Sequence, residues 1–185
     1  RLGMVGQYSC DVGVIVGAYL PTPTRKKDDA ALREALDDEY PLLVKSHGHR
    51  LLCFCGDLNA TLSRTLDSTK WFGGDNYNVS RTILENCISN LHLVDVVRNK
   101  WPATAKYTAF QSRKDKKKDT MVYWQARPDH FLVPQGRASR VEDVVVPDGE
   151  QWVRHIDGER YISVDKEGTL CGSDHVPIVV TMRLS

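Results

Sequence analysis

The stretch RLLCFCGDLN, residues 50–59, decides how this chain is expected to fold. Its apolar part, from Arg50 to Phe54, has the length of a buried strand, and the strand ends at Gly56-Asp57. Such a strand delivers the polar residues that follow it to the edge of a sheet. Asp57 and Asn59 are two residues apart, so both side chains can point to the same side of an extended strand end.

Two helices are predicted where apolar residues recur every three or four positions. The first begins at about Asp28 and is broken or kinked near Pro41, because proline cannot donate the helical hydrogen bond. The second carries an apolar stripe from Ile83 to Leu91, with Asn78 or Ser80 as its N-cap.

Strand signals fill most of the remaining chain. Val12, Val14 and Val16 alternate with Gly13, Ile15 and Gly17 and predict a mostly buried strand, which the prolines at 21 and 23 end. After the second helix only strand signals remain, over residues 106–111, 121–125, 130–133, 141–146, 151–156, 160–164 and 176–182. Asp157-Gly158, between two of these runs, is a strong hairpin signal. We therefore expect an α/β fold with largely antiparallel pairing.

Length and composition indicate one globular domain. A chain of 185 residues can bury a core without disulfides or a structural metal. Its 41% hydrophobic and 26% charged residues exclude disordered, collagen-like and coiled-coil chains. Apolar stretches are strand-sized, well short of the roughly 20 residues that span a membrane. No membrane partner is expected, and no basic region followed by an apolar stretch stands at the start of this sequence.

Charge and cysteine content restrict the function less. The 25 basic and 24 acidic residues give a net charge of +1, so nucleic-acid binding cannot be inferred from the total. Five cysteines at irregular spacing, residues 10, 53, 55, 87 and 171, make no disulfide framework and favour a reducing compartment. Cys53 and Cys55 are separated by one residue, where zinc sites usually have two to four, so a buried structural role is favoured.

Polar clusters beside apolar strands supply the candidate chemistry. An aspartate such as Asp57 can orient a water and Asn59 can hold an oxyanion, although by itself this pair is more typical of an Asx turn. Asp174 is a hard oxygen ligand suited to Mg²⁺, next to His175, which can donate to a phosphate; the alternative is a surface turn. Asp129 can orient a histidine or form a structural pair with the nearby arginine.

Five motifs in a fixed order carry a resemblance to a known family. They are GAYLP (residues 17–21), CGDLNA (55–60), YT (107–108), RPDHFLV (127–133) and SDHVPI (173–178). In this order they resemble the endonuclease/exonuclease/phosphatase superfamily, which includes apurinic endonucleases, deoxyribonuclease I and inositol phosphatases. The segment LVDVVR, residues 93–98, looks most like the non-LTR retrotransposon endonucleases.

The resemblance implies a role for each matching residue. His175 contacts the scissile phosphate, Asp129 orients His175, and Asp174 binds Mg²⁺ or Mn²⁺. Asp57 activates the attacking water, and Asn59 holds that water or a phosphate oxygen. The remaining residues assigned to catalysis or to substrate binding are Tyr19, Thr108, Arg127, Trp71, Lys114, Lys116, Lys117 and Lys118. The lysines belong to a charged run, residues 113–119, whose net charge is +3. We expect this run to form a hairpin tip that faces DNA; the alternative is a tip that is merely solvated.

The resemblance also implies an architecture and two departures from it. The fold is expected to be a two-sheet, mostly antiparallel sandwich flanked by helices, of the four-layer α/β/β/α type. Residues 1–185 form one domain matching the C-terminal two-thirds of the family fold, and the family's metal-binding Glu motif is not visible. The fold is thus expected to be incomplete at its N-terminus, to be completed by an upstream segment or a partner chain. Residues 147–170 are an expected hairpin insertion.

The expected activity is metal-dependent phosphodiester hydrolysis, in the form of DNA nicking by a retrotransposon-like protein. Two alternatives remain open within the enzyme class, an apurinic repair endonuclease and a phosphatase on the same scaffold. A third is a non-catalytic interaction or structural module. Because the expected substrate is DNA, we expect an intracellular and nuclear location.

Overall fold

The computed structural model describes residues 4–10, 13–19, 49–69, 75–115, 119–147, 155–156, 159–160 and 175–184. Its strands are β1 (Met4–Cys10), β2 (Gly13–Tyr19), β3 (Leu51–Asp57), β4 (Leu93–Asp95), β5 (Ala109–Asp115), β6 (Thr120–Ala126), β7 (Asp129–Pro134), β8 (Val141–Val145), β9 (His155–Ile156), β10 (Glu159–Arg160) and β11 (Val179–Met182). Its helices are α3 (Asp75–Asn90), α4 (Val96–Lys100) and the 3₁₀ helix η2 (Gln135–Arg140). The helix expected from about Asp28 lies outside the described residues, as do Trp71, Lys116, Lys117, Lys118 and Asp174.

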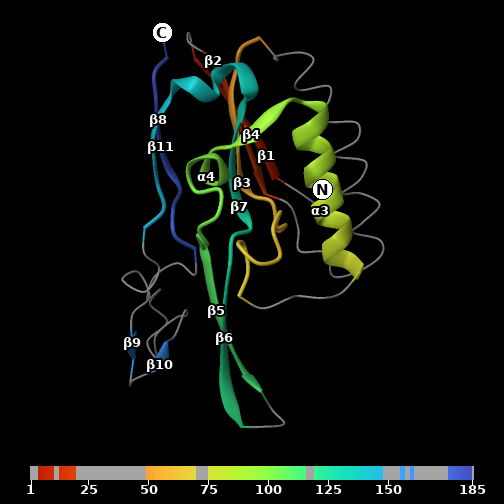
Figure 1. The fold of residues 1–185 in the computed structure, drawn as a ribbon, viewed down its shortest axis with the longest axis vertical. Coiled ribbons are helices and arrows are strands. Elements are labelled where there is room, and N and C mark those ends of the chain that lie inside the picture. Colours follow the sequence, from red (N-terminus) through yellow and green to blue (C-terminus); the bar gives the residue numbers. More distant parts are fainter. Residues whose placement is uncertain are drawn as a thin grey trace.

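A five-stranded sheet in the order β1-β2-β3-β7-β4 forms the centre of the molecule (Figure 1). β2 and β3 run parallel, and every other neighbouring pair in this sheet is antiparallel. A parallel pair is normally covered on both faces, which explains why the sequences of β2 and β3 are almost entirely apolar. The prediction of an α/β fold is confirmed, with one mixed sheet and smaller antiparallel ones.

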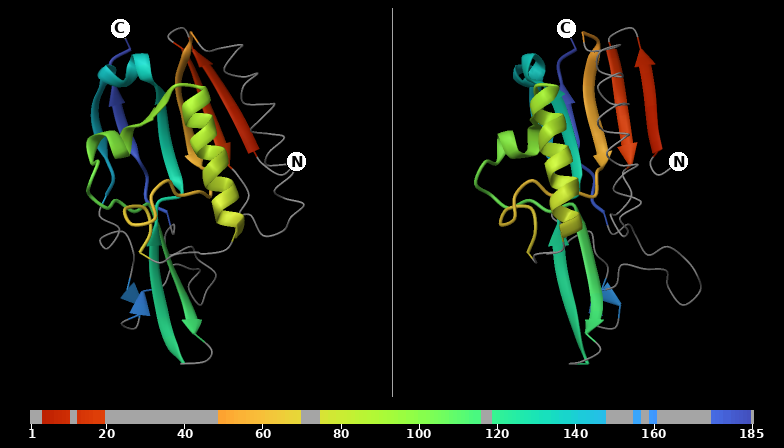
Figure 2. Two further views of the ribbon diagram at one scale, coloured as in Figure 1. Left: turned by 45° about the vertical axis from the view of Figure 1, so that its right-hand side comes forward. Right: turned by 90° about the vertical axis from the view of Figure 1, so that its right-hand side faces the viewer.

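Two apolar clusters pack on the two faces of this sheet. Alternate residues of β2 enter different clusters, since Val14 and Val16 belong to the first and Ile15 to the second. Leu84 of α3 packs into the first cluster, and Val144 of β8 packs into the second. Figure 2 shows α3 on one side of the sheet and the β8–β11 pair on the other. The central sheet therefore lies between α3 and the β8–β11 pair.

Most predicted strands after the second helix are confirmed, with ends that differ by a few residues. They are observed as β5, β6, β7, β8 and β11. The hairpin signal at Asp157-Gly158 agrees with the antiparallel pairing of β9 and β10 on either side of it. β5 and β6 form a long hairpin, paired from Ala109 with Ala126 to Asp115 with Thr120, that extends away from the central sheet (Figures 1 and 2).

Two predictions about helices are wrong. Strand signals alone were expected after the second helix, yet α4 follows β4 directly, because Asp95 accepts a hydrogen bond from Arg98 N and caps a helical turn. The second helix was expected to be capped at Asn78 or Ser80, but α3 begins at Asp75, an acidic residue that favours a first helical turn. Within the described residues, no helix is long and apolar enough to cross a membrane.

Candidate active site

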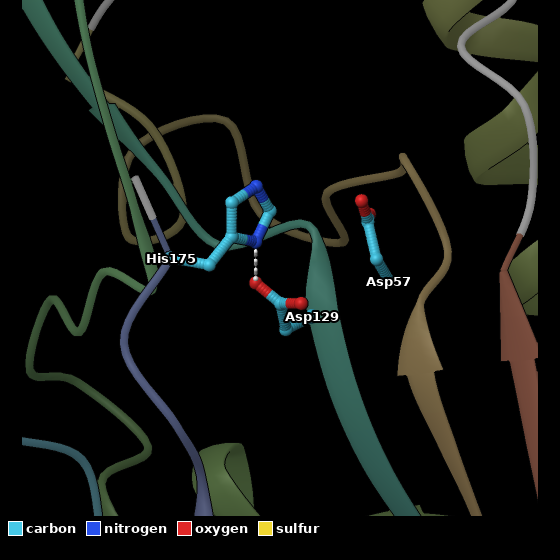
Figure 3. A group of neighbouring side chains, drawn as sticks. All are labelled: Asp57, Asp129 and His175. Atoms are coloured by element: carbon cyan, nitrogen blue, oxygen red, sulfur yellow. Dashed lines mark hydrogen bonds and ion pairs between the residues drawn. The ribbon is translucent and has the colours of Figure 1, made fainter. Parts of the chain in front are cut away.

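Two adjacent strand ends bring two carboxylates together. Asp57 is the last residue of β3, Asp129 is the first residue of β7, and the antiparallel register pairs them directly. Directly opposed residues of an antiparallel pair project from the same face of the sheet. The two carboxylates therefore lie side by side at one edge of the central sheet (Figure 3).

His175 reaches Asp129 from a segment far along the chain. It forms an isolated bridge with Ala109, and the adjacent Val176 N donates to Thr108 O at 2.7 Å. His175 Nδ1 lies 2.7 Å from Asp129 Oδ2, which also accepts a 2.6 Å hydrogen bond from Thr108 Oγ1. Because a carboxylate accepts, Nδ1 carries a proton, and Nε2 points away from Asp129 in Figure 3. The His175 side chain is 27% exposed, so a substrate can approach it.

Asn59 is tied to Asp57 by a local turn. Asn59 N donates to Asp57 Oδ1 at 2.9 Å, and Asn59 Nδ2 donates to Oδ2 at 3.4 Å. The backbone of Asn59 is left-handed, with φ of 46°, a conformation that asparagine tolerates better than most residues. The Asx turn that the sequence offers as an alternative to a functional pair is present, and it lies within the site.

Gly56 allows the strand ends to meet. Its φ is 140°, and a Cβ at this position would lie 1.9 Å from Ala18 O of the neighbouring β2. Only glycine adopts this conformation at this distance without displacing backbone. The parallel register of β2 and β3 then puts Tyr19, which is 45% exposed, at the same sheet edge as Asp57.

The electrostatic environment of Asp57 disfavours its charged form. Burial raises the pKa of the Asp57 carboxyl above its usual range, and the negative charge of Asp129 acts in the same direction. The amide of Asn59 and the nearby His175 and His130 lower this pKa but do not outweigh burial. A carboxyl with a raised pKa accepts a proton more readily than an ordinary aspartate, as a general base must.

The donor set at this edge fits a hydrated divalent cation. Asp57, Asp129 and His175 each offer one ligand atom, and these atoms lie within 4.8 Å of one another. Two carboxylates supply the oxygen ligands that Mg²⁺ prefers, with lone pairs left over after the hydrogen bonds described above. Asp174, the residue expected to bind the metal, is not among the described residues.

Arg127, which we expected to bind substrate, lies in a buried ionic network. Its guanidinium is 0% exposed and donates to Asp67 through Nε at 2.9 Å and through Nη2 at 3.2 Å. Arg127 Nη1 donates to Asp95 Oδ2 at 2.8 Å and lies 3.3 Å from His130 Nδ1. Arg98 also pairs with Asp67. The charge of Arg127 is thus neutralised by two internal carboxylates and is shielded from solvent.

The structure brings together only some of the residues assigned from the sequence. Asp57, Asn59, Asp129 and His175 converge, and Thr108, which is fully buried, contacts Asp129. Lys114 lies on β5 near the tip of the long hairpin, opposite Met121. The residues of the assigned set that fall outside the described ranges are Trp71, Lys116, Lys117, Lys118 and Asp174.

The buried network beneath the site was missed by the sequence analysis. Asp67, Asp95 and His130 are buried polar residues that contact Arg127 or one another. One signal was present for Asp95, since it interrupts the apolar run from Leu93 to Val97, where a charged residue needs a partner. Nothing local identifies that partner, because Asp95 and Arg127 are 32 residues apart.

Comparisons with known proteins relate the fold to nucleases and phosphatases. No family model matches the sequence, and no curated protein matches it. Among solved structures, the fold is similar to a variant of the 3′ phosphatase NExo from Neisseria bound to product DNA hairpin, with a TM-score of 0.64 and 18% identity. It is also similar to the 3′-5′ exonuclease NExo from Neisseria meningitidis, with a TM-score of 0.65 and 17% identity. An AP endonuclease from Archaeoglobus fulgidus gives a TM-score of 0.66 and 18% identity.

The coverage of these comparisons is unequal. The first structure matches 97% of this chain, and each of the other two matches 96% of it. This chain, however, spans only 64% of the length of each matched chain. At such low identity, the likeness shows a fold shared with these three proteins and no more. Activity and substrate must be argued from the residues of the site.

Proposed function

We propose that this protein is a divalent-metal-dependent phosphodiesterase that cleaves DNA. The observation that carries the proposal is the 2.7 Å contact between Asp129 and His175, next to a second carboxylate, Asp57, at the edge of the central sheet. Phosphodiester hydrolysis needs a positioned water, a Lewis acid and donors to the developing negative charge. The candidate site offers residues to position the water, to hold the Lewis acid and to donate to the developing charge, and the reaction needs no covalent nucleophile.

The side chains of the site divide the tasks of the proposed reaction between them. Asp129 holds His175 through Nδ1, and His175 directs Nε2 to the scissile phosphate. Asp57 takes the proton of the attacking water, and Asn59 supplies an amide donor to that water or to a phosphate oxygen. A divalent cation held by the carboxylates, with Asp174 as a further ligand, would polarise the phosphoryl group when bound.

The cation itself is tested by titration. We expect Asp174→Ala to weaken the binding of Mn²⁺, used as a probe for Mg²⁺, because the ion loses an oxygen ligand. Isothermal titration of the parent and the variant in the same buffer measures this affinity. Equal affinities would remove Asp174 from the proposed ligand set.

DNA is favoured over other phosphodiesters by one feature, the long β5–β6 hairpin. It carries Lys114 in the described part and projects away from the central sheet (Figure 2). One of the similar structures, the phosphatase from Neisseria, is bound to a DNA hairpin. Nicking of DNA by a retrotransposon-like protein, in the nucleus, is the specific form that we propose, on the strength of the sequence motifs alone.

The proposed architecture is the four-layer sandwich with a further segment. The β8–β11 pair would belong to the second sheet, and an upstream segment of the same polypeptide or a partner chain would complete it. This proposal is supported by the resemblance and by the 64% coverage of the matched chains. Assaying the chain with and without such a segment tests it, since nicking that requires the segment supports completion.

A nicking assay on supercoiled plasmid tests the function. We expect the parent to nick in Mg²⁺, and His175→Ala to lower kcat by at least about 10²-fold because a donor to the phosphate is lost. Glu142→Gln is the matched control, since Glu142 lies on β8, half exposed and paired with Arg183. Intact duplex, abasic duplex and a phosphoinositide are offered side by side.

The outcome decides between the proposed activity and its alternatives. Preference for abasic duplex indicates a repair endonuclease, and preference for the phosphoinositide indicates a phosphatase. Activity that His175→Ala leaves unchanged comes from a contaminant and contradicts the site. A protein that binds DNA without cleaving any substrate, with or without the further segment, is a non-catalytic module.

A further inference from the structure

The segment of residues 58–68, which we name the Asn59 loop, joins β3 to the buried network. It carries Asn59 directly beside the site, on an irregular stretch of backbone. Leu58 N donates to Pro128 O at 3.0 Å, which attaches the start of the loop to the residue before Asp129. Asn59 thus leaves β3 at a fixed point, and its own position depends on what holds the residues after it.

His130 supplies the next attachment. The His130 residue is 1% exposed, and its Nε2 donates to Ala60 O at 2.9 Å across 70 residues of sequence. Its other ring nitrogen, Nδ1, lies 3.1 Å from Asp95 Oδ2, which in turn accepts from Arg127. The ionic network therefore orients the imidazole through Nδ1, and Nε2 of the same ring binds the backbone of the Asn59 loop.

The backbone of Asn59 needs this support. A left-handed residue other than glycine is strained, and such a conformation persists only where its surroundings over-determine it. The bonds at Leu58 N and Ala60 O bracket Asn59 on its two sides. The bracket keeps Asn59 N within 2.9 Å of Asp57 Oδ1, so it also orients the carboxylate assigned to the attacking water.

The same network attaches the far end of the loop. Asp67 Oδ2 accepts from Leu62 N at 3.1 Å and from Ser63 N at 2.8 Å, while Arg127 neutralises Asp67. These bonds hold residues 62–67 but do not touch Asn59 or its immediate neighbours. The contact of His130, by contrast, falls on Ala60, the residue directly after Asn59.

We propose that His130 is a positioning residue, which holds Asn59 and, through it, Asp57 in the geometry that the reaction requires. His130 is adjacent to Asp129 in β7 but points away from the site, because successive residues of a strand face opposite sides of the sheet. It acts on the reacting groups through the Ala60 carbonyl. The catalytic part of this inference rests on the proposed function, and the positional part does not.

Two substitutions separate the two contacts of the imidazole. In His130→Gln the side-chain amide can reach as far as Nε2 and donate to Ala60 O. In His130→Asn the shorter amide reaches only as far as Nδ1, toward Asp95, and leaves the Ala60 carbonyl without its donor. We expect His130→Gln to retain most of kcat for plasmid nicking. We expect His130→Asn to lose about 10²-fold in kcat with little change in KM, because a small displacement of catalytic groups is that damaging.

Amide hydrogen exchange, measured by NMR, gives a readout that needs no activity. We expect the Asn59 amide to exchange at least tenfold faster in His130→Asn than in the parent, and at the parental rate in His130→Gln. The Val14 amide, which donates to Arg50 O at 2.8 Å, is the reference for the central sheet. Faster exchange at Asn59 alone supports positioning, even if the variant is less stable overall.

Two results would overturn the inference. One is equal acceleration at Asn59 and Val14, which would reduce His130 to a general contribution to stability. The other is the same loss of kcat in both variants, which would assign the effect to Asp95 or to packing. If the parent itself does not nick DNA, the proposed function fails, and exchange at Asn59 still decides whether His130 positions the loop.

Discussion

Replacing Arg127 with methionine tests whether this arginine stabilises the fold or binds substrate. Methionine has a similar length and no charge, so the buried carboxylates of Asp67 and Asp95 lose their shared cation. Three hydrogen bonds between 2.8 and 3.2 Å disappear from a site that solvent does not reach. The network would then hold two negative charges against the remaining positive charge of Arg98.

The size of the effect follows from burial. Removing one partner of a buried ion pair usually destabilises a protein by about 3–5 kcal/mol, because the other charge is left without compensation. Asp67 keeps Arg98 and two backbone amides, and Asp95 keeps His130. We therefore expect the lower end of that range, about 3 kcal/mol, which is a large part of the total stability of about 5–15 kcal/mol of a typical domain.

Urea unfolding at pH 7, followed by circular dichroism and tryptophan fluorescence, measures this loss. With a slope of about 1–3 kcal/mol per molar urea, the midpoint should fall by about 1 M or more. The control is Arg183→Met, because the side chain of Arg183 is 65% exposed and lies 3.1 Å from Glu142. We expect the control to change stability by less than about 1 kcal/mol.

A midpoint for Arg127→Met that matches the control would refute the reasoning from burial. A parental midpoint combined with weakened DNA binding would restore the assignment of Arg127 to substrate binding. A low midpoint, with DNA affinity unchanged in the fraction that remains folded, is the result that the structure leads us to expect.

Three further predictions concern charge. Asp57→Asn should raise the Tm at neutral pH in the presence of a chelator, because burial and Asp129 raise the pKa of Asp57 and so destabilise its charged form in the folded protein. An unchanged Tm would contradict the burial of this charge. In the nicking assay, the same variant should lose at least about 10²-fold in activity. Burial by itself would raise the pKa of Asp95, but the hydrogen bond and charge of His130 and the charge of Arg127 outweigh it and hold this pKa well below its usual range. The charged Asp95 carboxylate therefore contributes its full stabilisation above about pH 4, and this stabilisation is lost as the pH falls further. The urea midpoint of the parent should drop more steeply below about pH 4 than that of Asp95→Asn. Parallel curves of midpoint against pH would refute this. Alanine at all four hairpin lysines should weaken DNA binding for every sequence and flatten the slope of log affinity against log salt, because phosphate contacts release counterions; an unaltered slope would mean that the tip is merely solvated. The four positions are Lys114, Lys116, Lys117 and Lys118.

The strands could be predicted because the alternation of buried positions along a strand is visible in the local sequence. Val14 and Val16 face one apolar cluster and Ile15 faces the other, and that alternation is legible without any knowledge of the neighbours. Residues 93–97 were harder to interpret. There a three-residue strand passes directly into a short helix, and an apolar run of this length is compatible with either structure.

Part of the site was also predictable. Asp57 and Asn59 follow an apolar strand, and Asp129 begins another, so their place at a sheet edge follows from where the strands end. The register that pairs Asp57 with Asp129 is a property of the assembled sheet. So is the contact between Asp129 and His175, which are 46 residues apart.

The sequence by itself determined the α/β class, the strand ends that carry the polar motifs, and the identity of the acids and the histidine that converge. Only the tertiary structure decided which charges face each other. Arg127 stands two residues from Asp129 yet pairs with Asp67, 60 residues away, and His130 bonds to Ala60 across 70 residues. A hydrophobic residue needs only an apolar environment, which a periodic pattern reveals. A buried polar group needs one particular partner at hydrogen-bond distance, and the folding of distant segments against each other supplies it.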